Sequence, residues 1–311
     1  MLAHKEHIMT EDDAARRAAL AAARTVGMAL ALAEGWLRAA GVGETPSLDA
    51  QVLLGQVTDA NRAVTLAYPE RALSAEQAAR YAELIARRAA HEPVAYLTGH
   101  REFMGLDLLV DRRVLIPRPE TELLVEAALA DLAERLARTP QSPPLVADIG
   151  VGSGAIPIAL AVGEPRLPRL YGADISPEAL ALARENATRL GVAARITFLE
   201  GDLLAPLPKP VDLLTANLPY VAPDDPDVPR SVSAYEPALA VYGAGDGLGH
   251  IRRLLAQAPS SLRPGASLYL EFGYDQGAAI QRLALDAFPG ANLRLGADYA
   301  GWDRYIAIRL P

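Results

Sequence analysis

The sequence predicts an α/β protein in which a small all-α domain precedes a doubly wound, mainly parallel sheet. Strand and helix patterns alternate after residue 145, which is typical of a parallel sheet with helical crossovers. An Ala- and Leu-rich helical pattern fills residues 25–90. A glycine-rich turn follows the first strand of the alternating region, as in many ligand-binding α/β folds.

The first part of the chain divides into an extension and a helical domain. We expect residues 1–24 to be a solvated extension, disordered or frayed, because their acidic residues are wrong for a transit peptide. Residues 25–92 are the predicted helical domain, in which Ser74 to Gln77 is typical of a capping box. Pro93 ends its last helix, because proline disfavours helical geometry in the residue before it.

A linker then leads into the α/β domain. Residues 93–116 are expected to form a β-hairpin linker with strands at Val94–Leu97 and Leu106–Val110. The α/β domain covers residues 117–311 and begins with a helix from about Glu120 to Ala137. Its expected strands are Leu145–Ile149, Leu170–Ala173, Ile196–Leu199, Asp212–Ala216 and Ser267–Phe272.

Composition excludes several classes of function. The net charge of −8 argues against direct nucleic-acid binding, which depends on clustered Lys and Arg. The absence of cysteine excludes disulfides and thiolate sites and indicates the cytoplasm. No apolar run approaches the roughly 20 residues that cross a bilayer. The five histidines are scattered, so no metal is expected, and we expect a monomer.

The glycine-rich turn has the sequence Asp148-Ile149-Gly150-Val151-Gly152-Ser153-Gly154. Glycine at a strand-to-helix turn lets the backbone approach a ligand closely, although a turn without a ligand and a dinucleotide site are alternatives. The G-x-G-x-G spacing, with an acid two residues before the first glycine, differs from the G-x-G-x-x-G of nicotinamide proteins and resembles methyltransferase motif I. The predicted cofactor contacts here are Gly150, Val151, Gly152, Ser153 and Gly154.

Further cofactor contacts are predicted after the second and third strands. Asp174 closes the second strand, where a carboxylate accepts hydrogen bonds from both ribose hydroxyls. The alternative for Asp174 is a helix N-cap, which Ser176 can supply instead. Asp202 and Leu203 follow the third strand, where we expect them to meet an adenine amino group and the adenine face, an ordinary turn being the alternative.

The run Asn217-Leu218-Pro219-Tyr220 leaves the fourth strand at the same edge and supplies the predicted catalytic residues. Methylating an amide or aromatic amine is difficult because the nitrogen lone pair is delocalised. The Asn217 side-chain oxygen and the Leu218 carbonyl can accept from both N–H groups and leave the lone pair facing a methyl donor. Pro219 would stiffen the turn and Tyr220 would stack on the planar group. The alternative is a proline turn that ends a strand.

These residues resemble a known family. The quartet resembles the Asn-Pro-Pro-Tyr motif of amino-methyltransferases, and the chain from Thr25 onward is similar to the bacterial release factor glutamine methyltransferases, the HemK or PrmC family. The matching motifs are Glu92-Pro93 to Phe103, Ile116-Pro117-Arg118-Pro119-Glu120-Thr121-Glu122, Asp148 to Gly154, Tyr235-Glu236-Pro237, Asp246-Gly247-Leu248, and Leu270-Glu271-Phe272-Gly273 with Gln276.

The resemblance implies a class I (Rossmann-like) methyltransferase sheet and S-adenosyl-L-methionine as cofactor. It also implies that residues 25–92 dock a class I peptide chain release factor, whose Gly-Gly-Gln glutamine is methylated at N5. Gly150 to Gly154, Asp174, Leu203 and Asn217 would contact the cofactor, and Asn217 to Tyr220 the glutamine.

Leu218 departs from the family, which usually has proline there, and Asn-Leu-Pro-Tyr is typical of ribosomal RNA adenine dimethyltransferases. The acceptor at that position is a backbone carbonyl, which leucine retains. Three alternatives therefore stay open: an RNA adenine methyltransferase, a ribosomal protein glutamine methyltransferase, and a non-catalytic adaptor that binds release factors. The roles of Glu120, Glu236 and Glu271 also stay open.

Overall fold

The computed structural model describes residues 10–43 and 45–311, which form two compact units. The helical unit contains the described residues up to Gly99 together with Pro229–Tyr235. The α/β unit contains His100–Val228 and Glu236–Pro311. Each unit has its own hydrophobic core.

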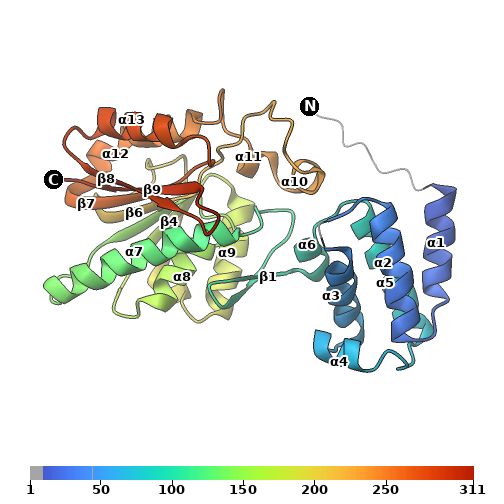
Figure 1. Ribbon diagram of the computed structural model, residues 1–311. Helices are drawn as coiled ribbons and strands as arrows, with labels where there is room; N and C mark the ends of the chain where they lie inside the picture. Colours follow the sequence, from blue (N-terminus) through green and yellow to red (C-terminus); the bar gives the residue numbers. More distant parts are fainter. Residues whose placement is uncertain (1–9, 44) are drawn as a thin grey trace. The chain divides into compact units, whose positions relative to one another are not determined.

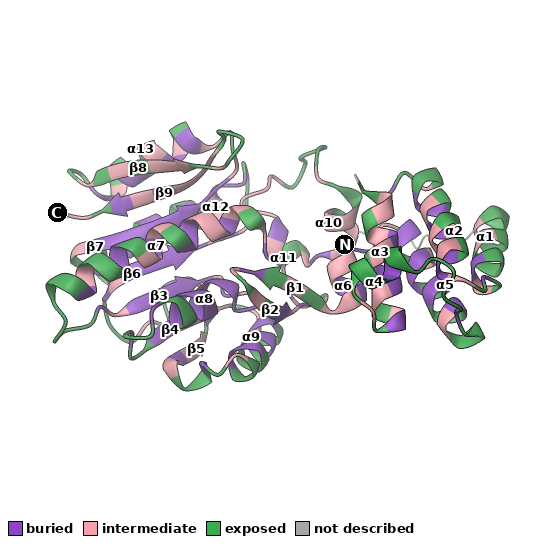
Figure 2. Ribbon diagram, turned by 60° about the horizontal axis from the view of Figure 1, so that its bottom comes forward, coloured by how far each residue is buried: buried purple, intermediate pink, exposed green. Residues whose placement is uncertain are grey.

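In the helical unit, helices α1, α2, α3, α5 and α6 contribute to one core (Figures 1 and 2). Trp36, Leu53 and Tyr81 are buried at its centre. The predicted capping box is confirmed, since the Ser74 hydroxyl accepts from the Gln77 amide and the Gln77 side chain accepts from the Ser74 amide. Its helices are α1 (Glu11–Ala21), α2 (Val26–Ala39), α3 (Pro46–Thr58), α4 (Arg62–Ala67), α5 (Ala75–Ala89), α6 (Val94–Thr98) and α10 (Arg230–Tyr235).

Residues 1–24 were expected to be a solvated extension, and residues 1–9 of it lie outside the described part. Helix α1 occupies most of the described remainder, residues 10–24. Thr10 and Asp13 form a capping box, and acidic residues in the first turn complement the positive helix N-terminus. Leu20 is buried in the core, and the Trp36 indole N–H donates to Asp13 Oδ1 at 3.0 Å. The acidic residues that suggested solvation therefore start a packed helix.

The predicted hairpin is displaced along the chain. Val94–Leu97 was expected to be a strand but lies in helix α6, which ends where Gly99 adopts φ 77°. The strands are β1 (His100–Phe103) and β2 (Leu106–Leu109). Met104 and Gly105 both have positive φ, as a two-residue hairpin turn requires. Phe103 and Leu108 are buried in the α/β core, so the hairpin belongs to that unit.

The large sheet confirms the doubly wound α/β class (Figure 1). Its strands have the order β5-β4-β3-β6-β7-β9-β8, and all pairs from β5 to β7 are parallel. All five predicted strands are present, whereas the antiparallel pairing of β8 with β9 was not predicted. The strands are β3 (Val146–Ile149), β4 (Leu170–Asp174), β5 (Ile196–Glu200), β6 (Val211–Ala216), β7 (Leu262–Glu271), β8 (Asn292–Ala297) and β9 (Asp303–Arg309).

Helices cover both faces of this sheet, and Figure 2 shows the buried strands between them. Alternate side chains of each strand point to opposite faces, which gives two separate cores. The first face carries α7 (Pro119–Arg138), α8 (Ala155–Gly163) and α9 (Pro177–Arg189), and the second α12 (Gly249–Ser261) and α13 (Gly277–Ala287). No helix within residues 10–43 and 45–311 is long and apolar enough to span a bilayer.

The strand order reverses at β3. The chain proceeds from β3 to β4 and β5 on one side, and then crosses to β6 on the other side of β3. In open α/β sheets, ligands bind beyond the carboxyl ends of the strands at such a reversal. The glycine-rich turn follows β3 and Asn217 follows β6, so the topology brings both predicted motifs to this position.

We predict that Leu20→Ala lowers the free energy of unfolding of the helical unit by about 2–5 kcal/mol, since it leaves a cavity in the core. Urea denaturation followed by the fluorescence of buried Trp36 measures the change. Arg17→Ala, on the exposed side of α1, is the matched control. Equal stability of the two variants would show that α1 does not pack as described.

Candidate active site

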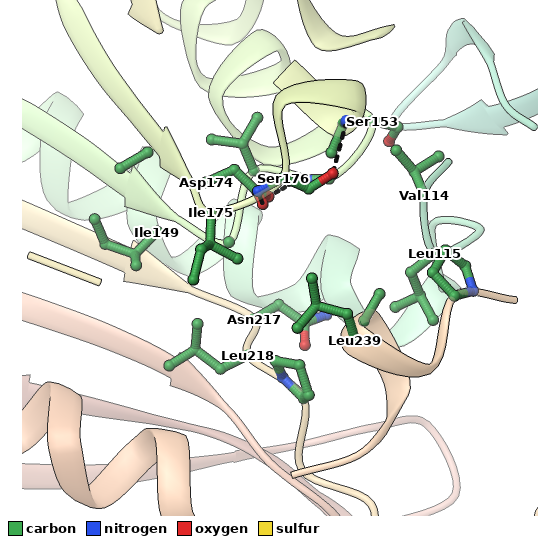
Figure 3. A pocket seen from close by; sticks show the side chains of 18 of the residues that line it. Val114, Leu115, Ile149, Ser153, Asp174, Ile175, Ser176, Asn217, Leu218 and Leu239 are labelled. Atoms are coloured by element: carbon green, nitrogen blue, oxygen red, sulfur yellow. Dashed lines mark hydrogen bonds between the residues drawn. The ribbon is translucent and has the colours of Figure 1, made fainter. Parts of the chain in front are cut away.

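A cavity of about 200 Å³ lies at the carboxyl edge of the sheet. It is walled by the segment that precedes α7, the glycine-rich turn, the ends of β4 and β6, the turn after β5, and the short helix α11 (Ala238–Val241). Figure 3 shows Ser153, Asp174 and Ser176 on one side of the cavity, with Asn217 and Leu218 on the opposite side. All of its lining residues belong to the α/β unit.

The cavity brings together all but two of the predicted site residues. The two exceptions are Gly154 and Tyr220, which are not among the residues that line it. Those that line it are Gly150, Val151, Gly152, Ser153, Asp174, Asp202, Leu203, Asn217, Leu218 and Pro219.

The three glycines of the turn have positive φ and different surroundings. A Cβ on Gly150 would lie 3.1 Å from the Asn217 carbonyl oxygen, so the two loops are in close contact. A Cβ on Gly154 would lie 3.2 Å from the Cβ of Ala183 in α9, so this glycine allows α8 and α9 to pack closely. Around Gly152 no described protein atom lies within 4 Å of that position, which leaves room for a ligand.

Asp174 supports the turn and faces the cavity. Its carboxylate accepts from the Gly152 amide at 2.9 Å and the Ser176 amide at 2.9 Å. Ser176 is the N-cap of α9, which removes the alternative that Asp174 serves there. Burial raises the pKa of Asp174, and the backbone hydrogen bonds oppose that rise.

Asp202 and Leu203 lie on the far side of the turn. Leu203 is buried and has a φ of 51°, which is unusual for a leucine. Asp202 forms an ion pair with Arg253 of α12. Arg253 also lines the cavity, although no role was predicted for it. The ion pair is half exposed and contributes little to stability.

Asp148, the acid that precedes the glycines, lies beneath the turn rather than in the cavity wall. The Thr215 hydroxyl donates to Asp148 Oδ1 at 2.7 Å, and these residues are direct partners in the β3–β6 register. Asp148 Oδ2 has no hydrogen-bond partner in the described part of the chain. Burial raises the pKa of Asp148 to about 7.

The segment after β6 is held from two directions. The Asn217 side-chain amide donates to Thr121 Oγ1 at 3.1 Å, and the Tyr220 hydroxyl donates to Glu271 Oε1 at 3.2 Å. The Gln276 side chain donates to the Tyr220 carbonyl at 2.9 Å. Tyr220 therefore points to Glu271, while Asn217 and Leu218 face the cavity.

Glu236 shapes the wall that precedes α7. Its carboxylate accepts from the Ile116 amide at 3.0 Å and from Arg118 at 2.6 Å, and its side chain is 1% exposed. This segment places Leu115, Pro117 and Thr121 at the cavity, although no role was predicted for them. The sequence signal that could have indicated a role for them is the motif from Ile116 to Glu122, which leads into α7.

Comparison with known proteins identifies the class to which the α/β unit belongs. Residues 146–243 match a family described as a methyltransferase domain, so the α/β unit is of the methyltransferase class. Residues 28–99 match the PrmC N-terminal domain.

Most of the chain matches bacterial proteins that share one name among themselves. The release factor glutamine methyltransferase of Moorella thermoacetica is 47% identical over 288 residues, covering 92% of this chain and 99% of that protein. The protein of that name in Koribacter versatilis is 41% identical, with 86% and 92% covered. The chain therefore belongs to the release factor glutamine methyltransferase family.

Among solved structures, the ribosomal protein L11 methylase of Lactobacillus delbrueckii subsp. bulgaricus aligns with 63% of this chain and 81% of its own. Its identity is 22% and its TM-score 0.44, and nothing further is concluded from this likeness.

The buried Asp148 predicts a pH dependence of stability. Its folded pKa of about 7 lies above the ordinary value of 3.8, so the folded protein binds the proton more tightly. Stability therefore falls as pH rises between these values, by at most about 1.4 kcal/mol per pH unit.

Asp148→Asn cannot ionise, and we expect it to lose less stability than the wild type between pH 5 and pH 8. Hydrogen exchange of the β3 and β6 amides measures this change. Asp286→Asn, at an exposed position of α13, is the control. A variant that follows the wild-type slope would contradict the prediction.

Proposed function

We propose that the protein transfers a methyl group from S-adenosyl-L-methionine to N5 of the glutamine in the Gly-Gly-Gln loop of class I peptide chain release factors. The observation that carries this proposal is the Asn217 amide. Its nitrogen is bonded to Thr121, while its oxygen has no hydrogen-bond partner among residues 10–43 and 45–311. An unpaired acceptor in the cavity that holds the glycine-rich turn fits an amide N–H substrate.

The cavity fits the proposed cofactor, which supplies an electrophilic methyl group when bound. The open space at Gly152 admits a ligand against the backbone. We assign the ribose hydroxyls to Asp174, and its pKa, which burial raises, supports this because a desolvated carboxylate gains from such donors. We assign the adenine contacts to Asp202 and Leu203, and backbone contacts to Gly150, Val151 and Ser153. Gly154 is proposed to act through helix packing.

The acceptor side follows from the hydrogen-bonding capacity of the substrate amide. We propose that Asn217 Oδ1 and the Leu218 carbonyl accept its two N–H bonds, so that the nitrogen lone pair faces the methyl group. Methylation makes this nitrogen acidic, so no strong base is required. Tyr220 does not line the cavity, and we assign it to holding the loop through Glu271 instead of stacking on the amide.

We further propose that the helical unit docks the release factor and that the enzyme acts as a cytoplasmic monomer. A ribosomal protein glutamine is a second possible target of the same chemistry. An RNA adenine has one specific observation in its favour, Leu218, and is opposed by the net charge of −8. A non-catalytic adaptor would not require the unpaired Asn217 oxygen.

We expect Asp174→Asn to weaken S-adenosyl-L-methionine binding by roughly 10- to 100-fold, because a charge-assisted hydrogen bond contributes about 1.5–3 kcal/mol. Isothermal titration calorimetry measures the dissociation constant. Asp286→Asn is the control for the loss of one negative charge. Unchanged affinity in the Asp174 variant would remove this residue from the cofactor site.

We expect Asn217→Ala to lower methyl transfer to a full-length release factor at least about 100-fold without a change in thermal stability. Transfer of labelled methyl groups measures the rate, and Asn292→Ala at an exposed position of β8 is the matched control. Equal labelling of a release factor whose loop glutamine is changed to alanine would overturn the target. Ribosomal RNA and ribosomal proteins assayed in parallel test the other substrates.

A further inference from the structure

Four side chains form a hydrogen-bonded chain that reaches the cavity at Thr121 and Asn217. We call it the Glu271 relay: Glu271, Thr121, Asn217 and Tyr220. Thr121 Oγ1 donates to Glu271 Oε2 at 2.7 Å, and Asn217 Nδ2 donates to Thr121 Oγ1 at 3.1 Å. The Tyr220 hydroxyl donates to the other oxygen of Glu271 at 3.2 Å. Glu271 is 2% exposed and Thr121 4%, so the hydrogen bond between these two residues is shielded from water.

The relay has a direction when Glu271 is ionised. A carboxylate only accepts, so the single hydroxyl hydrogen of Thr121 is committed to Glu271. Thr121 therefore offers Asn217 only a lone pair of its hydroxyl oxygen. This lone pair accepts a hydrogen bond from the amide nitrogen of Asn217 and cannot bond to the amide oxygen. The Asn217 oxygen is left on the other arm of the amide, where it has no partner in the described part of the chain.

Protonation of Glu271 allows the direction to reverse. A neutral carboxyl group can donate to Thr121 Oγ1, which then gives its own hydrogen to an amide oxygen. Asn217 would satisfy this arrangement with its amide rotated by half a turn. The rotated amide presents N–H groups, which cannot accept from the nitrogen of a substrate amide.

The surroundings place this switch near neutral pH. Burial raises the pKa of Glu271 to about 7, and Glu120 of α7 adds to the rise, whereas the hydrogen bonds from Thr121 and Tyr220 oppose it. Burial raises the pKa of the neighbouring Tyr220, and the positive charges of Arg118 and Arg304 oppose that rise. Both protonation states of Glu271 are thus populated near neutral pH.

We propose that Glu271 is a positioning residue, which acts through Thr121 to turn the oxygen of Asn217, and not its nitrogen, toward the nitrogen that is methylated. The kinetic consequence of this assignment rests on the proposed function. The orientation of the amide is a property of the protein itself and is measured without substrate.

The kinetic experiment replaces the middle of the relay. Thr121→Val keeps the shape of the side chain but neither donates nor accepts, so kcat for methylation of a release factor at pH 8 should fall about 10- to 100-fold. Thr121→Ser keeps the hydroxyl and should restore the rate to within a few-fold. The dissociation constant of S-adenosyl-L-methionine should change little, whereas the melting temperature should fall because buried Glu271 loses one of its donors. Thr188→Val at an exposed position of α9 is the control. Equal kcat in Thr121→Val and the wild type would overturn the proposal.

The pH profile tests Glu271 directly. The ionised form is the competent one, so the wild-type kcat should rise with pH through about 7. Glu271→Gln retains one acceptor but cannot ionise, so its profile should be flat over that range. A profile in Glu271→Gln that rises like that of the wild type would assign the dependence to another group and overturn the relay.

Nuclear magnetic resonance of ¹⁵N-labelled asparagine side chains separates this proposal from the proposed function. The Asn217 amide signals, assigned by their loss in Asn217→Ala, should shift with pH in the wild type with a midpoint near 7 and stay constant in Glu271→Gln. Signals that do not respond to pH in the wild type would overturn the relay. Failure of the wild type to methylate any release factor would overturn the proposed function alone.

Discussion

The parallel pairing of β3 with β4 on one side and β6 on the other is the constraint on which the site depends. Neighbouring parallel strands end at the same edge of the sheet, so the segments that follow them lie next to each other there. At this edge the glycine-rich turn and the Asn217 segment are in van der Waals contact. The Asp148–Thr215 hydrogen bond joins the two strands two residues before the first glycine of the turn.

The cavity wall before α7 is built differently, because it is irregular chain with few backbone partners of its own. Glu236 compensates by accepting from Ile116 and Arg118 with a buried carboxylate. A buried charge with two donors is costly to disturb, since removal of either partner leaves an uncompensated group. The same arrangement recurs at Glu271. Buried carboxylates thus hold the irregular parts of the site in place, while the sheet holds the regular parts.

Sequence patterns correctly predicted the features that depend on interactions between residues close together in the chain. The five parallel strands, the Ser74 capping box and the strand-to-helix glycine turn each depend on residues close together in the chain. The partnership of Thr121 with Glu271 spans 150 positions, so no spacing rule reveals it. The Tyr220–Glu271 hydrogen bond was not predicted for a similar reason, because a motif fixes the backbone turn but not the partner of a side-chain hydroxyl. Helix α1 was missed because its acidic first turn was taken as a sign of solvation and not of capping.

The close approach of Gly150 to the Asn217 carbonyl and the Leu218 side chain makes the two ligand loops a single packed body. Leu218 is 4% exposed and packs into the same core as Ile149. A ligand that stiffens one loop therefore acts on the other. Thermodynamic linkage makes this influence symmetrical, because each ligand changes the affinity for the other by the same factor.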